Sequence, residues 1–228
     1  MAITFLNSTG ATIATAASTW SIVPHSSLEG GAGLVLGIGM ASSGQSVSTV
    51  TDAPAGNVWR RAVAVPTTRP VAVEMWYATG TSSNSTRISI TLSGASSGTV
   101  AVAQFLGIST ANALSVTGSS AQNGNSTVFG ASVITPPTAN QVVVSYGMLT
   151  FSSLGTITNL SGMTTWISTS VVPRSHGMYE IQGAASTQGG DWKTSSRGLG
   201  ANVIAAFSDT AVMGGARRRG LRMFGVGG

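Results

Sequence analysis

The sequence predicts an all-β protein, a two-sheet antiparallel sandwich of jelly-roll type with an extended C-terminal arm. Three observations predict it. Short segments alternate apolar and polar residues with a period of two, as in residues 71–78. Turn-forming residues separate these segments at a spacing of roughly 8–12 residues, which is typical of sandwiches and barrels. No stretch of about a dozen residues combines a helical apolar period with capping residues.

Residues 70–108 are the stretch around which the chain is organised. Val71, Val73, Met75 and Tyr77 alternate with Ala72, Glu74, Trp76 and Ala78, and similar alternation follows in residues 88–92 and 100–106. The segment 94–98, Gly-Ala-Ser-Ser-Gly, separates the last two and is interpreted as a hairpin loop. We therefore expect a meander of three strands, whose apolar face needs a second layer of structure to cover it.

The segments before the meander are expected to be short strands. Residues 3–6 form the first, and residues 1–30 are a candidate extended N-terminal segment. Residues 33–41 read GLVLGIGMA and indicate a buried strand, with which residues 47–51 can pair. The turn Asp-Ala-Pro-Ala-Gly at 52–56 precedes an alternating strand at 58–65.

The segments after the meander continue the same pattern. Strands are expected at 114–117, 127–134, 141–149, 165–171, 177–182 and 201–207. The run QVVVSYGML at 141–149 is the clearest of them, because it joins β-branched residues to an aromatic one. Residues 1–212 are therefore assigned to one sandwich domain.

Composition sets limits on function. Hydrophobic residues make up 42% of the 228 residues and charged residues only 7%, against a usual quarter. Such a chain can bury a core, and its surface must be covered by neutral Ser, Thr, Asn and Gln, which is typical of proteins packed in an assembly. The chain has 0 cysteines, which excludes disulfides, thiolate metal sites and a cysteine nucleophile.

The positive charge is concentrated in residues 213–228, MGGARRRGLRMFGVGG. Four of the 11 basic residues lie there, so the rest of the chain has seven basic against six acidic residues. The expected partner-docking residues of this arm are Arg217, Arg218, Arg219, Leu221, Arg222, Met223 and Phe224. Three interpretations stay open: a frayed solubilising tail, docking on a protein partner, or binding to nucleic acid or another anionic surface.

Candidate catalytic motifs are present but lack the context that their chemistry requires. Gly94–Gly98 fits G-x-S-x-G around Ser96, yet a β-strand follows it where a nucleophile elbow needs a helix. His176 and Glu180 lie four residues apart in an extended segment, roughly 13 Å along a strand and too far for one metal ion. His25 and His176 are the 2 histidines of the chain and its only candidates for acid–base chemistry at neutral pH. We therefore expect no enzyme, no metal site and no cofactor.

Aromatic residues leave an alternative function open, because exposed rings on a sandwich can stack against sugars. Trp76 shares a strand face with Glu74 and is a candidate glycan-stacking residue, as is Trp192. The competing interpretation is that these rings fill the core or seal its ends. Asn-Ser-Thr recurs at 7–9, 84–86 and 125–127, a thin basis for a duplication in a Ser/Thr-rich chain, and the triplets are interpreted as turns.

The order of the segments VAVEMWYA, TRISITLSG and TVAVAQFLGI, the Thr-Pro-Pro before QVVVSYGML and the closing ANVIAAFS resembles β-sandwich proteins encoded by bacteriophages. The likeness covers about residues 70–208. It implies a virion structural role, either as a capsid decoration protein or as a tail or fibre component. It brings no catalytic or ligand-binding motif.

These observations lead to one expected function. The chain is expected to be a non-enzymatic virion protein that decorates or cements the capsid surface; the alternatives are a tail or fibre component and a carbohydrate-binding host-recognition module. Its expected partners are a major capsid or other virion protein and further copies of itself, with a trimer favoured. Nucleic acid is expected only through the arm. A signal peptide and a membrane span are not expected, because residues 33–40 are the longest apolar run near the N-terminus.

Overall fold

The computed structural model describes residues 2–24, 28–54, 56–65, 70–150 and 156–210, with side chains of 123–125 left aside. Within these ranges the chain forms strands and no α-helix, which confirms the all-β prediction. The strands are β1 (Thr4–Ile22), β2 (Gly33–Met40), β3 (Val47–Ala53), β4 (Arg60–Ala64), β5 (Ala72–Ala78), β6 (Arg87–Leu106), β7 (Leu114–Phe129), β8 (Gln141–Thr150), β9 (Ile157–Asn159), β10 (Thr164–Ser168), β11 (Arg174–Gln182) and β12 (Trp192–Ser208).

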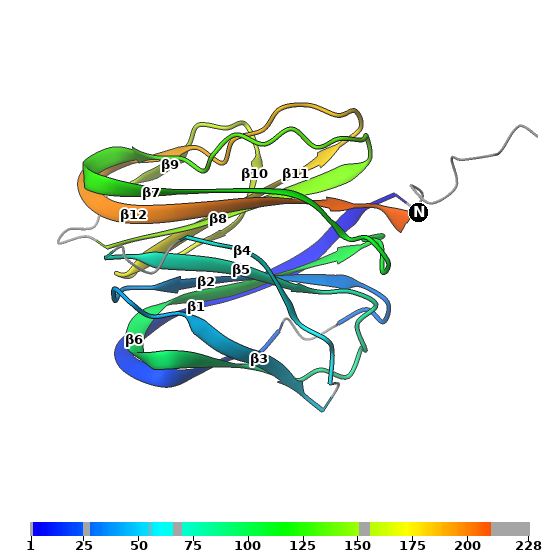
Figure 1. Ribbon diagram of the computed structural model, residues 1–228, viewed down its shortest axis with the longest axis horizontal. Coiled ribbons are helices and arrows are strands. Elements are labelled where there is room, and N and C mark those ends of the chain that lie inside the picture. Colours follow the sequence, from blue (N-terminus) through cyan, green and yellow to red (C-terminus); the bar gives the residue numbers. More distant parts are fainter. Residues whose placement is uncertain (1, 25–27, 55, 66–69, 151–155, 211–228) are drawn as a thin grey trace, which may run out of the picture.

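Two antiparallel sheets pack face to face, as Figure 1 shows, and the predicted two-sheet sandwich is confirmed. The first sheet has the order β1-β6-β2-β5-β4, with β3 also paired to β6. The second has the order β10-β11-β8-β12-β7, with β9 also paired to β12. The first half of the chain thus forms one sheet and the second half forms the other. This order differs from a jelly roll, whose two Greek keys distribute neighbouring strands over both sheets.

The expected three-strand meander is wrong, because β5 and β6 are not neighbours: β2 lies between them and pairs with both. The segment Gly94–Gly98 is not a hairpin loop, because it lies inside the 20-residue strand β6. Residues 98–105 of β6 pair with β2, whereas residues 87–92 pair with β3. β6 therefore changes direction at 93–97 and belongs to two layers. Its small residues allow that corner as readily as they would allow a turn.

Other boundaries also differ from the sequence predictions. The first strand does not end at residue 6: β1 runs through the predicted extended N-terminal segment and pairs with β6 along most of its length. The strand expected at 114–117 continues to Phe129 as β7, so it includes only the first three residues of the strand expected at 127–134. The strands expected at 33–41 and 141–149 are confirmed as β2 and β8.

The space between the sheets holds the largest cluster of buried apolar side chains, here called the inter-sheet core. Both sheets contribute to it through every second residue of their central strands, as the period of two requires. Its members include Val35, Met75, Tyr77, Ala103, Phe105, Val144, Tyr146, Met148, Val203, Ala205 and Phe207.

The outer face of each sheet is also buried. The first outer cluster lies over β2 and includes Trp20, Leu34, Leu36, Ile38, Ile88 and Ile90. The second lies over β8 and includes Phe129, Val143, Leu149, Met178, Trp192 and Ile204. Long strands that fold back over their own sheet supply the covering residues, and this explains why β2 and β8 are apolar on both sides.

Candidate functional site

A buried carboxylate links three strands of the first sheet. Glu74 of β5 is 1% exposed and points into the outer side of that sheet. Its Oε1 accepts a hydrogen bond of 2.9 Å from the backbone N–H of Val47, and its Oε2 accepts one of 2.9 Å from Trp76 Nε1. Arg61 Nη1 lies 3.8 Å from the same Oε2. Glu74 therefore ties β3, β4 and β5 together through partners on both of its carboxyl oxygens.

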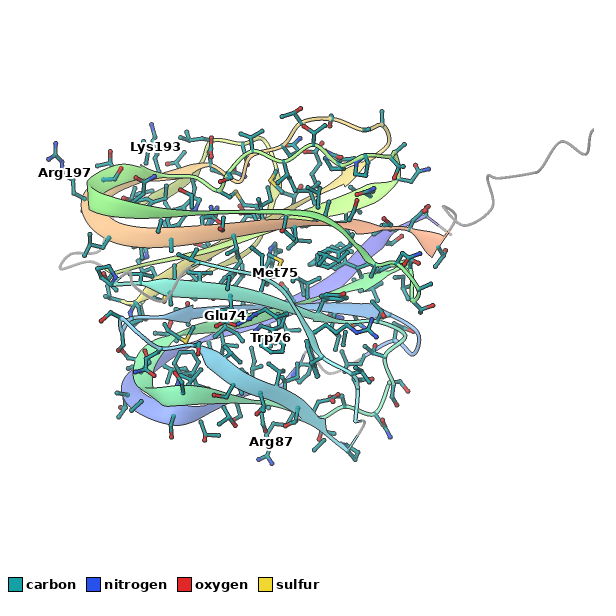
Figure 2. All side chains as sticks on the ribbon, viewed as in Figure 1. Glu74, Met75, Trp76, Arg87, Lys193 and Arg197 are labelled. Carbon is teal, nitrogen blue, oxygen red and sulfur yellow. The ribbon has the colours of Figure 1, made fainter. Side chains whose placement is uncertain are left out.

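Trp76 lies where the sequence placed it, on the same side of β5 as Glu74 (Figure 2). Its side chain is half-buried and packs against the first outer cluster, as does Trp59. The hydrogen bond to Glu74 holds the indole N–H inward. Part of the ring remains accessible, so Trp76 stays a candidate for stacking against a ligand.

Trp192 cannot serve as a stacking surface, and that prediction is wrong. The residue is 0% exposed. Its ring stacks on Phe129 with centroids 5.0 Å apart and lies 5.6 Å from the ring of His176. Trp192 is a core residue of the second sheet. For Trp192 the competing interpretation from the sequence, that these rings fill the core or seal its ends, is the one that the structure bears out.

The motifs around Ser96 and His176, which were rejected on sequence grounds, both lie on β-strands, and both residues are buried. Ser96 is buried at the corner of β6, where its Oγ donates to the carbonyl of Ser97 and its carbonyl accepts from Trp20 Nε1. His176 and Glu180 lie on β11, which pairs with β8. In the described part of the chain, no group of three His, Cys, Asp or Glu residues could hold a metal ion.

His176 is the unusual titratable group of the second sheet. It is 3% exposed, and neither ring nitrogen has a hydrogen-bond partner within the described residues. Burial, together with the charge of Arg174, lowers the pKa of His176 from 6.5 to about 4. The folded protein therefore holds a neutral imidazole at neutral pH.

This burial predicts a pH dependence of stability. The folded-state pKa lies below the unfolded value, so the unfolded chain binds the extra proton first as the pH falls. Stability should be complete above about pH 6.5 and decrease toward pH 4, by up to about 3 kcal/mol. Urea unfolding at a series of pH values measures it. His176→Leu should flatten the decrease between pH 6.5 and about 4.5, whereas the same substitution at His25, the other histidine, serves as the control. Equal slopes in wild type and His176→Leu would contradict the assignment.

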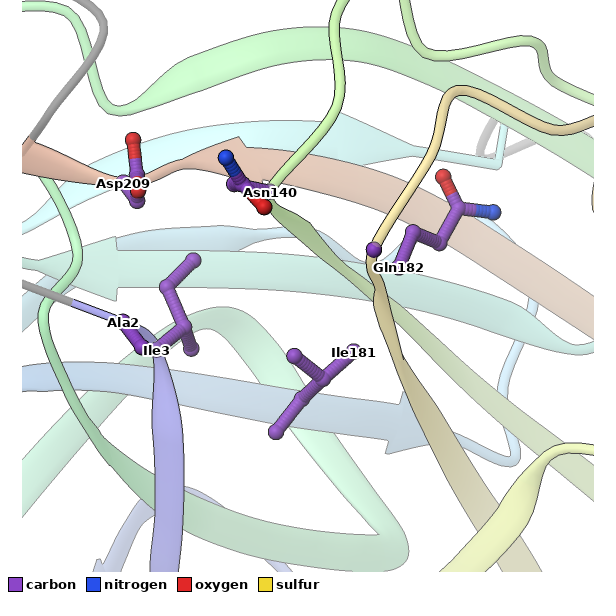
Figure 3. A pocket seen from close by; sticks show the side chains of 7 residues that line it. Ala2, Ile3, Asn140, Ile181, Gln182 and Asp209 are labelled. Atoms are coloured by element: carbon purple, nitrogen blue, oxygen red, sulfur yellow. The ribbon is translucent and has the colours of Figure 1, made fainter.

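An open pocket of about 330 Å³ lies at one end of the sandwich (Figure 3). Its lining residues are Ala2, Ile3, Asn140, Ile181, Gln182, Gly183 and Asp209. They come from the N-terminal segment, the entry to β8, the end of β11 and the end of β12. The pocket therefore lies close to both ends of the described chain.

The described chain ends at a fixed point beside this pocket. Asp209 is 2% exposed and forms a β-bridge with Ile108, and Thr210 donates its backbone N–H to the carbonyl of Gly107. The predicted docking residues Arg217, Arg218, Arg219, Leu221, Arg222, Met223 and Phe224 lie outside the described residues, as does His25. The sequence contained no signal for the pocket, because its lining residues are far apart in the chain.

The exposed basic residues of the described sandwich do not form one patch. Figure 2 shows Lys193 and Arg197 at one edge of the second sheet and Arg87 on the opposite side of the molecule. The guanidinium group of Arg61 forms a long ion pair with Glu74, with Nη1 3.8 Å from Oε2. A strong nucleic-acid footprint requires clustered basic residues on one face. Arg87 therefore does not share one face with Lys193 and Arg197.

Comparison with known proteins identifies no relative: no family model, curated protein or solved structure matches this chain. Among the described residues, no helix has the length and apolar character needed to cross a bilayer.

Proposed function

We propose that this chain is a non-enzymatic virion structural protein that decorates or cements a capsid surface. In this proposal the sandwich supplies a rigid neutral body, and residues 213–228 dock on a neighbouring subunit. The proposed location is the virion, and the proposed partners are a major capsid protein and further copies of this chain. The alternative location within this proposal is the tail or a fibre of the virion.

The observation that carries the proposal is the fixed origin of the arm. The bridge between Asp209 and Ile108 and the hydrogen bond from Thr210 to Gly107 hold the chain at the end of the sandwich. From there, residues 211–228 could reach up to roughly 60 Å if fully extended, which is enough to contact a neighbour. The segment combines four arginines with Leu221, Met223 and Phe224. Apolar anchors among cationic side chains suit a protein partner better than a purely electrostatic surface.

Deleting residues 213–228 tests this function. The full chain should form a closed oligomer, with a trimer favoured, and the deletion should shift its mass to that of a smaller species. The measurement is light scattering at low and high salt. The deletion variant should still unfold in one cooperative transition, because the deleted residues follow β12, the last strand that the structure describes. An oligomer of unchanged mass after the deletion would rule out docking through the arm.

Two matched variants separate the contributions of charge and apolar contact. Replacing the four arginines by glutamine should weaken assembly mainly at low salt. Replacing Leu221 and Phe224 by serine should weaken it at both salt concentrations, because apolar burial does not depend on screening. If neither variant changes the mass, the arm has no role in assembly.

A carbohydrate-binding module is the second candidate function. The observation that favours it is the half-buried ring of Trp76, held in orientation by Glu74 with Arg61 alongside. The full chain and the arm deletion can be compared on one glycan array. Equal binding by both would favour the module, because Trp76 lies in the sandwich and not in the arm.

A further inference from the structure

The two sheets have the same strand order. In the first sheet the order is β1-β6-β2-β5-β4 with β3 on β6, and in the second it is β7-β12-β8-β11-β10 with β9 on β12. Adding six to each label of the first sheet yields the second. In the described part of the chain, every pairing between two of these strands lies within one half of the sequence. The halves are therefore two six-stranded units, residues 4–106 and 114–208.

The residue register agrees as well as the strand order. Around β2 of the first unit, Val35 lies between Ala103 on one side and Tyr77 on the other. Around β8 of the second unit, Val144 lies between Ala205 and Tyr179. Each valine thus has an alanine neighbour on the long strand and a tyrosine neighbour on the opposite strand. Next along the long strands, Phe105 and Phe207 also correspond.

Two β-bulges recur at corresponding positions. The first lies at the start of the first strand of each unit: one extra residue separates Phe5 from Asn7 in β1, and one separates Leu114 from Val116 in β7, opposite Phe105 and Phe207 respectively. A bulge disrupts the ladder and re-aims the strand, so it is a specific structural feature. Unrelated sheets are not expected to share one at the same register.

The second shared bulge lies in the short edge strands. In β4 it falls between Arg61 and Val63, opposite Met75. In β10 it falls between Thr165 and Ile167, opposite Gly177. Met75 and Gly177 are themselves corresponding residues, because each lies two positions before the tyrosine of its unit.

The contacts between the units are reciprocal. Tyr77 of the first unit packs on Phe207 of the second, with ring centroids 5.4 Å apart. Tyr179 of the second unit packs on Phe105 of the first, with centroids 5.7 Å apart. Since the tyrosines correspond and the phenylalanines correspond, each unit makes the same contact with the other. This is the pattern of an isologous dimer with a two-fold axis.

Corresponding residues face each other where such an axis must pass. Gly37 of β2 corresponds to Tyr146 of β8, and a Cβ added at Gly37 would lie 2.3 Å from Cγ of Tyr146. Gly39 corresponds to Met148, and a Cβ there would lie 2.5 Å from the Met148 Cβ. Under strict symmetry, two tyrosines and two methionines would compete for the same space. Glycine in the first unit leaves room for the side chains of the second.

We propose that the chain is an internal duplication: two copies of one six-stranded unit, packed about a pseudo-two-fold axis near Gly37 and Tyr146. The inter-sheet core is then a self-recognition surface whose partner is the other unit of the same chain. Glycine opposite tyrosine makes the match one-sided. The second unit fits the first and not another copy of itself, so the fused chain closes its own interface.

The units have diverged elsewhere, which explains why the sequence conceals the duplication. The buried Glu74 of the first unit corresponds to the buried His176 of the second, since each lies three positions before the tyrosine of its unit. The Asn-Ser-Thr triplets do not correspond: the first lies in β1, the second before β6 and the third in β7. The duplication is therefore visible in register and not in repeated letters.

Double-mutant cycles on the full chain test the proposal. Tyr77→Leu is combined with Phe207→Leu, and Tyr179→Leu with Phe105→Leu, with unfolding by urea as the readout. Each pair should deviate from additivity by about 2- to 10-fold in the unfolding equilibrium constant, as contacting aromatic pairs do. The combination of Tyr77→Leu with Phe129→Leu, which lies in the second outer cluster, serves as the additive control. If either reciprocal pair is additive, the two-fold relation between the units is wrong.

An exchange of the glycine and the tyrosine tests the axis itself. Tyr146→Gly should leave a cavity, and Gly37→Tyr should clash with Tyr146. In the double variant Gly37→Tyr/Tyr146→Gly, one tyrosine ring again fills the space between the units, but it comes from the first unit instead of the second. The combined variant should have a higher thermal midpoint than either single variant. A midpoint no higher than that of Gly37→Tyr alone would overturn the placement of the axis.

Discussion

Replacing Glu74 by alanine is expected to lower the free energy of unfolding by about 2–6 kcal/mol, because one buried and one part-buried donor lose their acceptor at about 1–3 kcal/mol each. The donors are the backbone N–H of Val47 and the indole N–H of Trp76, both 2.9 Å from a carboxylate oxygen. Arg61 loses its carboxylate partner but is exposed to solvent, so its contribution should be small. Urea unfolding followed by tryptophan fluorescence measures the change.

Matched variants show which oxygen matters. Glu74→Gln retains the shape and one acceptor, so its effect should lie between wild type and alanine. Trp76→Phe removes one donor and leaves the bond from Val47 intact, so it should cost less than Glu74→Ala. If Glu74→Ala is no more destabilising than an exposed substitution such as Arg87→Ala, the carboxylate does not hold β3 and β5 together.

The sequence predicted the central strands, which are covered on both faces. The run at 141–149 became β8 and the run at 33–41 became β2, because an uninterrupted apolar strand covered on both faces leaves no other interpretation for so short a segment. The prediction failed at Gly94–Gly98. Small residues permit both a hairpin turn and a corner within a strand, and only pairing with β2, β3 and β1 decides between them.

The site residues show the same limit. That Trp76 shares a face with Glu74 followed from the period of two along β5. The burial of Glu74 and Trp192 did not follow, because it depends on strands that fold over the outer faces from distant parts of the chain. Alternation determines the side to which a residue points, but not what covers that side.

The duplication was hidden for a related reason. At the axis, one unit needs glycine where the other has tyrosine, so the positions most constrained by the packing are those whose residues differ most. Strand order and bulge register are properties of pairing, which no single segment reveals. The Val-Ala-Tyr-Phe correspondence becomes recognisable only once the registers are known.

The most direct test of the two-unit account is to cut the chain between its halves. A protease site inserted between Thr110 and Ala111 lies in an exposed connection, and cleavage leaves both six-stranded sheets complete. The cleaved protein should keep the mass of the intact body, and its thermal midpoint should become dependent on concentration, as for a dimer. A protease site inserted between Ser83 and Asn84, within the first unit, provides the control. Cleavage there divides the first sheet, because it separates β1–β5 from β6, which stays joined to the second sheet. If the cut at residue 110 releases two separate folded halves or unfolds the protein, the inter-sheet core does not act as the interface between two like units.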